Sequence, residues 1–453
     1  LWPPCNHGRH QCPFSMAQPG KCTEGGVAGR RRGIGISRIT SSSPRSADSV
    51  EPMEETGAAK VAALCSRVLQ QNWREGDENG RHYGFTAPSP GHYPWQWYWD
   101  SGFHAIVWRR LDPARARLEL ETLLDASRDG FIGHITFLGR PLDLERAIRY
   151  NVATRHAPTT STIQPPLLAW AWSIAVGDPA EEPRIQEHHE WLRTHRDLEG
   201  DNLLWLIQPD ESGMDASPKF DHIWGRRAHG RWPFPLLIHA NRRRGFDAHR
   251  IAAGGRPVVC EVVTNVLWSL SEQALGSKSP TPALVDRLWN DDIGRFIDDV
   301  RSPVHSIEAP DVPFTWDTLA PLALPDLPQE IAHRLVEETL LRRDRFWDGV
   351  PLPSVALNDP THTSQEYFWG LRRIWRGPSW VNAAWFVWMG LNRLGYADEA
   401  AAMCDQLVTV VLRQGLREYY HPRSGAGLGA HDFGWSSLVW EIVDPLDRME
   451  RSM

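Results

Sequence analysis

The sequence lacks several features that would place it in well-known protein classes. No apolar run approaches the 18 or so residues of a membrane-spanning helix, so we expect no transmembrane anchor. The patterns GxxxxGKS/T, HExxH and GxSxG are absent, which leaves a phosphate-binding loop, a zinc protease and a serine hydrolase without support. The glycines of GAGLGAH, residues 425–431, follow a proline turn rather than a strand, which argues against a dinucleotide site.

Cysteine is scarce, with six in 453 residues. Three lie within the first 22 residues, at spacings that match no standard zinc-binding pattern. The other three are isolated in stretches that look helical: Cys65, Cys260 and Cys404. Because an odd number remains for pairing, we expect buried, reduced thiols in a cytoplasmic protein, with no bound metal.

Charge is unevenly distributed along the chain, whose formal net charge is -7. Residues 1–50 contain seven Lys/Arg and two Asp/Glu, so the remainder holds 42 basic and 54 acidic side chains. An acidic body disfavours nucleic-acid binding. Residues 1–55 are rich in Gly, Pro, Ser and Arg and show no periodic apolar face, so we expect a disordered leader. The first residue is Leu, so this segment could also be a translated upstream region, with Met16 or Met53 as the true start.

Deleting residues 1–55 is expected to leave the melting temperature of the body essentially unchanged. A segment without an apolar face contributes little burial to the folded state. Thermal unfolding of the shortened chain would test this expectation, and a clear fall in melting temperature would show that the leader packs on the body.

Helical periodicity is what the body has in abundance. The overall composition, 41% hydrophobic and 23% charged, is that of an ordinary globular protein. Alternating strands are missing, and apolar residues recur at spacings of three and four in seven segments: 57–73, 112–127, 163–176, 257–275, 328–341, 378–395 and 397–414. Two of them open with proline, at Asp112-Pro113 and Gly377-Pro378-Ser379, where a first helical turn tolerates it. We therefore expect one all-α domain over residues 56–453, with long functional loops at one end.

The segment YPWQWYWDSGFHAIVW, residues 93–108, places several aromatic rings directly before Asp100. Asp100 could simply cap a helix N-terminus while the rings pack in the core. Alternatively, its carboxylate could accept hydrogen bonds from sugar hydroxyls beside a tryptophan platform. Tryptophan is abundant in this chain, with 23 residues, which fits either interpretation.

Two further segments carry carboxylates that could take part in acid–base chemistry. PDESGMDASPKFD, residues 209–221, has four acids in thirteen positions, any one of which could be desolvated enough to act as an acid. LREYYHPRSGAGLGAHDFGWSS, residues 416–437, places Glu418 beside two tyrosines. Surface acids are the ordinary explanation for each. Two carboxylates on separate loops are also what glycosidic bond hydrolysis requires, one as acid and one as base or nucleophile.

These segments, with WRGPSWVNAAW at 375–385 between the last two, resemble glycoside hydrolase family 63 and its MGH1-like group, which includes bacterial mannosylglycerate and glucosylglycerate hydrolases. Processing alpha-glucosidase is a more distant relative of the group. The resemblance covers about residues 57–445. It implies that residues 56–453 form a glycoside hydrolase catalytic domain with an (α/α)6 barrel, inversion at the anomeric carbon, and a pocket built from the loops at one end of the barrel.

Within this resemblance, Asp215 looks like the general acid and Glu418 like the general base that activates water. The residues implied to line the sugar subsite are Tyr93, Gln96, Trp97, Trp99, Asp100, Gln164, Trp375, Arg376, Gly377 and Trp380. Core packing remains an alternative role for Trp375 and Trp380. The implied partner is a small carbohydrate, with no cofactor, nucleic acid or membrane, and a homo-oligomer stays open.

Two positions depart from the pattern expected of glycerate-specific members. Ile374 stands where we expect a tyrosine before the WRGP-like motif, and Phe433 where we expect a glutamine near the C-terminal motif. Recognition of a glycerate group is therefore in question. A trehalase-type or debranching-type glucosidase on the same barrel and a catalytically silent sugar-binding protein remain alternatives.

Overall fold

The computed structural model describes residues 56–140, 159–225, 233–302, 308–368, 371–372 and 374–445. Residues Glu55–Met453 form one compact unit. The expected leader, residues 1–55, lies outside the described residues. In the described part of the chain, no helix has both the length and the apolarity needed to cross a membrane.

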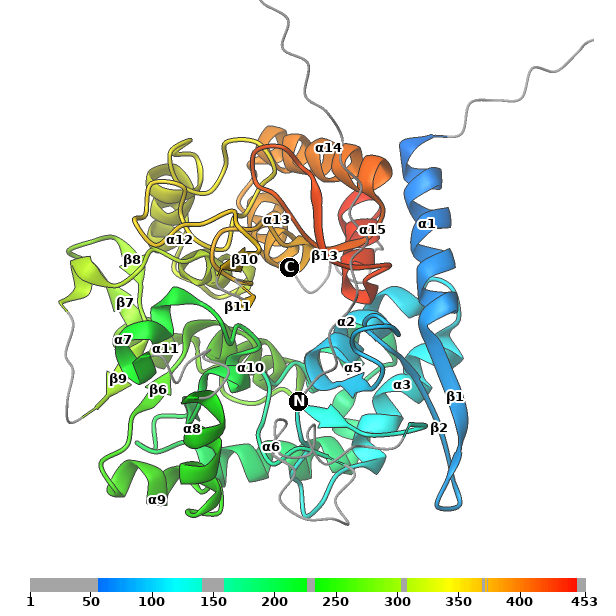
Figure 1. Cartoon of the computed structure of the whole chain (residues 1–453), viewed down its shortest axis with the longest axis vertical. Helices are drawn as coiled ribbons and strands as arrows, with labels where there is room; N and C mark the ends of the chain where they lie inside the picture. The colour runs from blue at the N-terminus through cyan, green and yellow to red at the C-terminus, as the bar shows by residue number, and fades with distance from the viewer. Residues whose placement is uncertain are drawn as a thin grey trace, which may run out of the picture. The chain divides into compact units, whose positions relative to one another are not determined.

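Helices dominate this unit, and they differ in how much of their surface is covered. Every residue of α2 (Tyr98–Trp108) is buried, and α10 (Val262–Ala274) and α13 (Val381–Arg393) are buried over most of their length. In contrast, α1 (Gly57–Asn72) and α14 (Ala397–Gln414) each bury one stripe. An all-round apolar helix must be covered on every side, whereas an amphipathic helix faces water. The helices therefore form an inner set and an outer set (Figure 1).

The inner segments contact one another in a closed sequence. α2 packs on α5 (Leu168–Ala175), α5 on α10, and α10 on the 3-10 segment η6 (Trp316–Ala323). η6 packs on α13, α13 on η8 (Gly434–Leu438), and η8 returns to α2. Figure 1 shows α2, α5, α10 and α13 near the middle of the unit, with α1, α12 and α14 toward its rim.

The remaining helices are outer or short. Those with eight or more residues are α3 (Pro113–Asp125), α6 (Pro183–Arg196), α8 (Pro233–Arg242) and α11 (Thr281–Leu288). The shorter ones are α7 (Asp221–Trp224), α9 (Ala248–Ala253), α12 (Gln329–Arg334) and α15 (Val439–Val443). The start predicted at Asp112-Pro113 is confirmed, because the Asp112 carboxylate accepts from the backbone N–H groups of Ala114 and Arg115.

Short antiparallel strands connect the helices, so the expectation of a chain without strands is wrong in detail. The longest pair, β1 (Trp73–Glu78) and β2 (Arg81–Thr86), forms a hairpin. Asn79 and Gly80 make its turn, with φ of 54° and 76°. Asn-Gly is the favoured pair for a two-residue hairpin turn, so the signal was present in the sequence.

The other sheets are small. Two-stranded pairs are β3 (Gln96–Trp97) with β4 (Ile135–Thr136), β7 (Trp289–Asn290) with β8 (Arg295–Phe296), β10 (Tyr367–Phe368) with β11 (Leu371–Arg372), and β12 (Arg417–Tyr420) with β13 (Gly427–His431). One three-stranded sheet has the order β5 (Trp205–Leu206), β6 (Val258–Cys260), β9 (Asp299–Arg301).

Two local expectations are corrected by the structure. Cys260 ends strand β6 rather than lying in a helix, because Glu261 caps α10 directly after it. Ser379 is extended and bridges to Tyr420, so α13 begins at Val381 and not at the proline. Cys65 and Cys260 are buried free thiols, as predicted, whereas Cys404 is free but only half-buried.

Candidate active site

Glu418 lies on the hairpin of β12 and β13, and the two strands hold its carboxylate in place. The pairing shifts register between Arg417 and Tyr419, so Glu418 occupies a bulge, a device that re-aims a side chain. The Tyr93 hydroxyl donates to Glu418 Oε1 at 3.0 Å, and the Ala430 N–H donates to Oε2 at 2.8 Å. The residue is only 3% exposed. Glu418 is thus a buried carboxylate fixed from both sides rather than a solvated surface acid.

Gly429 leaves the space that this carboxylate needs. Its φ is +65°, and a Cβ added there would lie 2.6 Å from Glu418 Oε2. Gly429→Ala should therefore push the carboxylate out of position and lower kcat by about 10²-fold, the cost typical of a misplacement near 1 Å. Steady-state kinetics would measure the loss.

Gly276→Ala is the matched control for Gly429→Ala. Gly276 has φ +69° and nothing within 4 Å of an added Cβ, so it carries the same backbone strain without the clash. We expect a similar small loss of stability from both variants and a kcat loss only at Gly429. Equal kcat in the two variants would contradict the steric argument.

The loop after η2 (Pro209–Ser212) carries Asp215, which is half-buried. Gly213 in this loop has φ +71°, and a Cβ there would lie 2.5 Å from the Trp99 indole. The loop therefore packs directly on Trp99, and only a residue without a side chain allows that approach.

The other acids of this loop have different surroundings. Glu211 is fully buried in a bidentate ion pair with Arg196, at 2.6 and 2.8 Å, so its role is structural. Burial first, and the charges of Glu211 and Asp215 next, raise the pKa of Asp210 to about 8. The sequence argument allowed for one desolvated acid in this loop. The desolvated acid is Asp210, and the charge of Asp215 contributes to its raised pKa.

Trp99 and Asp100 lie in the first turn of α2, and the Trp99 indole contacts the Asp215 loop at Gly213. The Trp99 N–H donates to Gln164 Oε1 at 3.1 Å. Trp97 occupies the N-cap position, so the interpretation of Asp100 as a helix cap is wrong. Burial raises the pKa of Asp100 well above its ordinary value, and the charges of Glu418 and Glu119 add to this. Because the charge of Glu418 acts on the Asp100 carboxyl, the two residues belong to one electrostatic cluster.

Trp375 and Trp380 stack in parallel, with ring centroids 3.7 Å apart and planes 3° apart. Both are at most 2% exposed and pack among Trp99 and Trp435. Trp375 has φ +60°, an uncommon conformation for a residue with a side chain. Backbone strain of this kind persists only where the surroundings enforce it. The stack therefore forms an apolar support behind Trp99.

The remaining predicted residues fall into two groups. Tyr93 and Trp97 are half-exposed, with rings perpendicular and centroids 5.6 Å apart. Gln96 is fully buried, and its Nε2 donates to the Glu119 carbonyl at 2.9 Å. The structure therefore places the Gln96 amide in the core behind the site.

The WRGP motif is held by contacts of its own. Arg376 donates to Asp221 Oδ1 at 2.6 Å. The Gly377 N–H donates to Ser354 Oγ at 2.9 Å, and a Cβ at Gly377 would collide with the Thr363 carbonyl. Gly377 is thus required by the close approach of two backbone segments.

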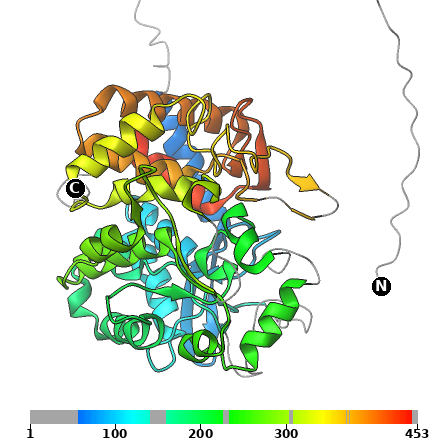
Figure 2. The same cartoon turned by 90° about the vertical axis from the view of Figure 1, so that its left-hand side faces the viewer.

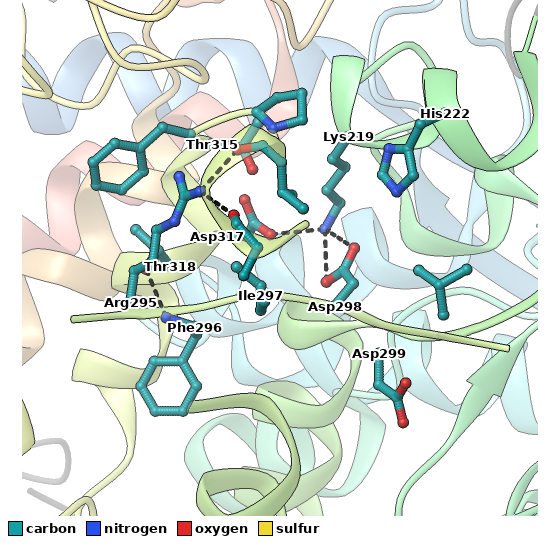
Figure 3. Close-up of a pocket in the computed structure, with 15 residues that line it drawn as sticks. Lys219, His222, Arg295, Phe296, Ile297, Asp298, Asp299, Thr315, Asp317 and Thr318 are labelled. Carbon is teal, nitrogen blue, oxygen red and sulfur yellow. Dashed lines mark hydrogen bonds and ion pairs between the residues drawn. The ribbon is translucent and has the colours of Figure 1, made fainter. Parts of the chain in front are cut away.

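Lys219 forms a buried charge cluster behind the Asp215 loop that the sequence did not indicate. Its ammonium lies 2.5 Å from Glu261, 2.9 Å from Asp317 and 3.1 Å from Asp298, and it borders a cavity of about 220 Å³ (Figure 3). Burial alone would lower the pKa of Lys219, but the three carboxylates raise it above its ordinary value. The carboxylate oxygens lie within 4.8 Å of one another, as metal ligands would, and the ammonium supplies the cation.

Comparison with known proteins decides the family. Residues 93–279 and 276–436 match the model of the mannosylglycerate hydrolase MGH1-like glycoside hydrolase domain. The chain belongs to this family. The protein is therefore a glycoside hydrolase, as the sequence motifs predicted.

Two relatives and one solved structure show how far the similarity of this glycoside hydrolase extends. It is 28% identical to a mannosylglycerate hydrolase of Rubrobacter radiotolerans, over 86% of this chain and 99% of the relative. It is 30% identical to that of Thermus thermophilus, over 82% and 97%. The crystal structure of a Thermus thermophilus mannosylglycerate hydrolase with Tris and D-glycerate covers 84% of this chain and 99% of its own, with 26% identity and a TM-score of 0.69.

Proposed function

We propose that this glycoside hydrolase cleaves an α-glucosidic or α-mannosidic bond in a small glycoside with inversion. Asp215 serves as general acid and protonates the leaving oxygen. Glu418 serves as general base and takes a proton from the attacking water. The observation that carries the proposal is the fixed Glu418 carboxylate beside Asp100, with the Asp215 loop packed on Trp99 from another part of the chain.

The proposed architecture is an (α/α)6 barrel. The closed sequence of contacts from α2 through α5, α10, η6, α13 and η8 back to α2 supports six inner helical segments. The amphipathic helices, such as α1 and α14, would then form the outer layer. The Trp99–Asp100 segment opens α2 and the Glu418 hairpin precedes η8, so both belong to neighbouring inner segments.

The aglycone is proposed to differ from a free glycerate. A desolvated carboxylate needs a fork of donors, which Arg usually supplies. Arg376 already donates to Asp221, and Ile374 has no donor in its side chain. Phe433 is buried between Tyr93 and Trp435, at centroid distances of 5.9 and 4.9 Å. We therefore propose that this enzyme prefers glucosylglycerate and mannosylglycerate less strongly than the dedicated enzymes do. A glycoside with a neutral aglycone should be the better substrate.

A panel of substrates tests this proposal. Rates of hydrolysis would be compared for mannosylglycerate, glucosylglycerate, trehalose, kojibiose and nigerose, and the first anomer released would be followed by proton NMR. Comparable cleavage of a glycerate ester and the free acid would support a neutral aglycone. Strong selectivity for the free acid would overturn it. Release of the α-anomer would overturn inversion.

A further inference from the structure

Glu366 is a carboxylate that the proposed chemistry does not use, although it contacts the hairpin that carries Glu418. It directly precedes strand β10, which projects from the body of the unit in Figure 2. Its Oε1 accepts from the Tyr419 hydroxyl at 3.0 Å and from the Gly429 N–H at 3.2 Å. One donor lies on β12 and the other on β13, so a single oxygen joins both strands of the hairpin from outside.

Each of these donors is the chain neighbour of a group that fixes the base. Tyr419 follows Glu418 directly after the bulge. Gly429 precedes Ala430, whose N–H donates to Glu418 Oε2. Successive backbone amides of β13 therefore hold two different carboxylates, first Glu366 and then Glu418. Gly429 has a left-handed φ of +65°, so β13 departs from regular strand geometry where these two carboxylates are held.

We propose that Glu366 is a positioning residue for the general base. It fixes the bulged hairpin, and hence the direction of the Glu418 carboxylate, through Tyr419 and Gly429. This inference rests on the proposed role of Glu418 as base.

An α-glycosyl fluoride isolates the step that the base performs. Water attacks the anomeric carbon, the C–F bond breaks, fluoride leaves with the bonding electrons, and the water proton passes to Glu418. Fluoride requires no protonation by Asp215, so the rate reports the base alone. The α-glucosyl and α-mannosyl fluorides would both be tested.

The variants are Glu366→Ala, Glu366→Gln and Tyr419→Phe. Glu366→Ala should lower kcat about 10- to 100-fold with KM within about threefold, because the base is misdirected while the sugar subsite is kept. Glu366→Gln should restore most of kcat, since its amide oxygen can accept both hydrogen bonds. Tyr419→Phe and Glu366→Ala should be non-additive in the double variant.

Glu330→Ala, on the exposed face of α12, is the control for removal of a carboxylate and should leave all parameters unchanged. The inference would be overturned by wild-type kcat in Glu366→Ala, by a loss confined to KM, or by a kcat in Glu366→Gln as low as that of Glu366→Ala. Glu418→Gln is measured in parallel. If that variant kept normal turnover, the assignment of the base itself would fail, whatever Glu366 does.

Discussion

Replacing Asp215 with asparagine should lower turnover of an unactivated glycoside about 10²- to 10⁴-fold, the usual contribution of a general acid. An alkoxide leaves slowly without a proton, and asparagine cannot provide one. The same variant should hydrolyse an α-glycosyl fluoride at a rate close to wild type, since fluoride leaves unprotonated. The ratio of the two rates, measured on one enzyme preparation, identifies the acid.

Glu418→Gln should show the opposite selectivity. The attacking water requires a base whichever group leaves, so turnover of both the glycoside and the glycosyl fluoride should fall. Asp286→Asn, on the exposed face of α11, serves as the surface control and should behave as wild type. Equal losses on both substrates in Asp215→Asn would contradict its assignment as acid. Normal turnover in Glu418→Gln would contradict the assignment of the base.

Lys219→Met should cost about 3–5 kcal/mol in the free energy of unfolding, the usual result of removing one partner from a buried ion pair. The methionine fills a similar volume, but Glu261, Asp298 and Asp317 would then face one another without a cation. Lys278→Met removes an exposed lysine and should change stability little. Chemical denaturation of both variants gives the comparison.

The loss in Lys219→Met should depend on pH. Burial raises the pKa of Asp298 to about 7 even with Lys219 present, far above the ordinary 3.8 of an aspartate. A carboxyl with a raised folded-state pKa favours the folded state at low pH, and this contribution is lost as pH rises through the folded value. The destabilisation should therefore be smaller near about pH 5 than near about pH 8. A loss independent of pH would show that packing, and not charge, dominates.

Much of the helical framework could be predicted because the outer helices carry their pattern in the sequence. α14 (Ala397–Gln414) has the bounds of the predicted segment, and α1 differs at one end only. Strand β6 was hidden because its apolar run continues into α10, and a short apolar run does not distinguish a buried strand from a helix.

The site was predicted unevenly. The family followed from motifs in the right order, and the match to the family model confirms it. The roles of Asp215 and Glu418 stay predictions. The Lys219 cluster and the contacts of Glu366 could not be predicted, because their partners come from distant positions. Lys219 and Asp317, for example, are 98 residues apart.

The hydrogen bond between Tyr93 and Glu418 also bears on how the chain folds. Its partners are 325 residues apart, and further contacts join the same two ends, including those of Asn72 with Asp432 and of Arg109 with Glu441. Closing such a long loop lowers the entropy of the chain before the contact forms and stabilises the structure. Long-range contacts of this kind therefore slow folding. A chain emerging from the ribosome can pack its early helices in order, but Tyr93 must wait for nearly the whole of synthesis to meet its partner. The buried faces of α2 stay uncovered until η8 arrives, which is the interval in which a growing chain is most exposed to aggregation and most dependent on chaperones.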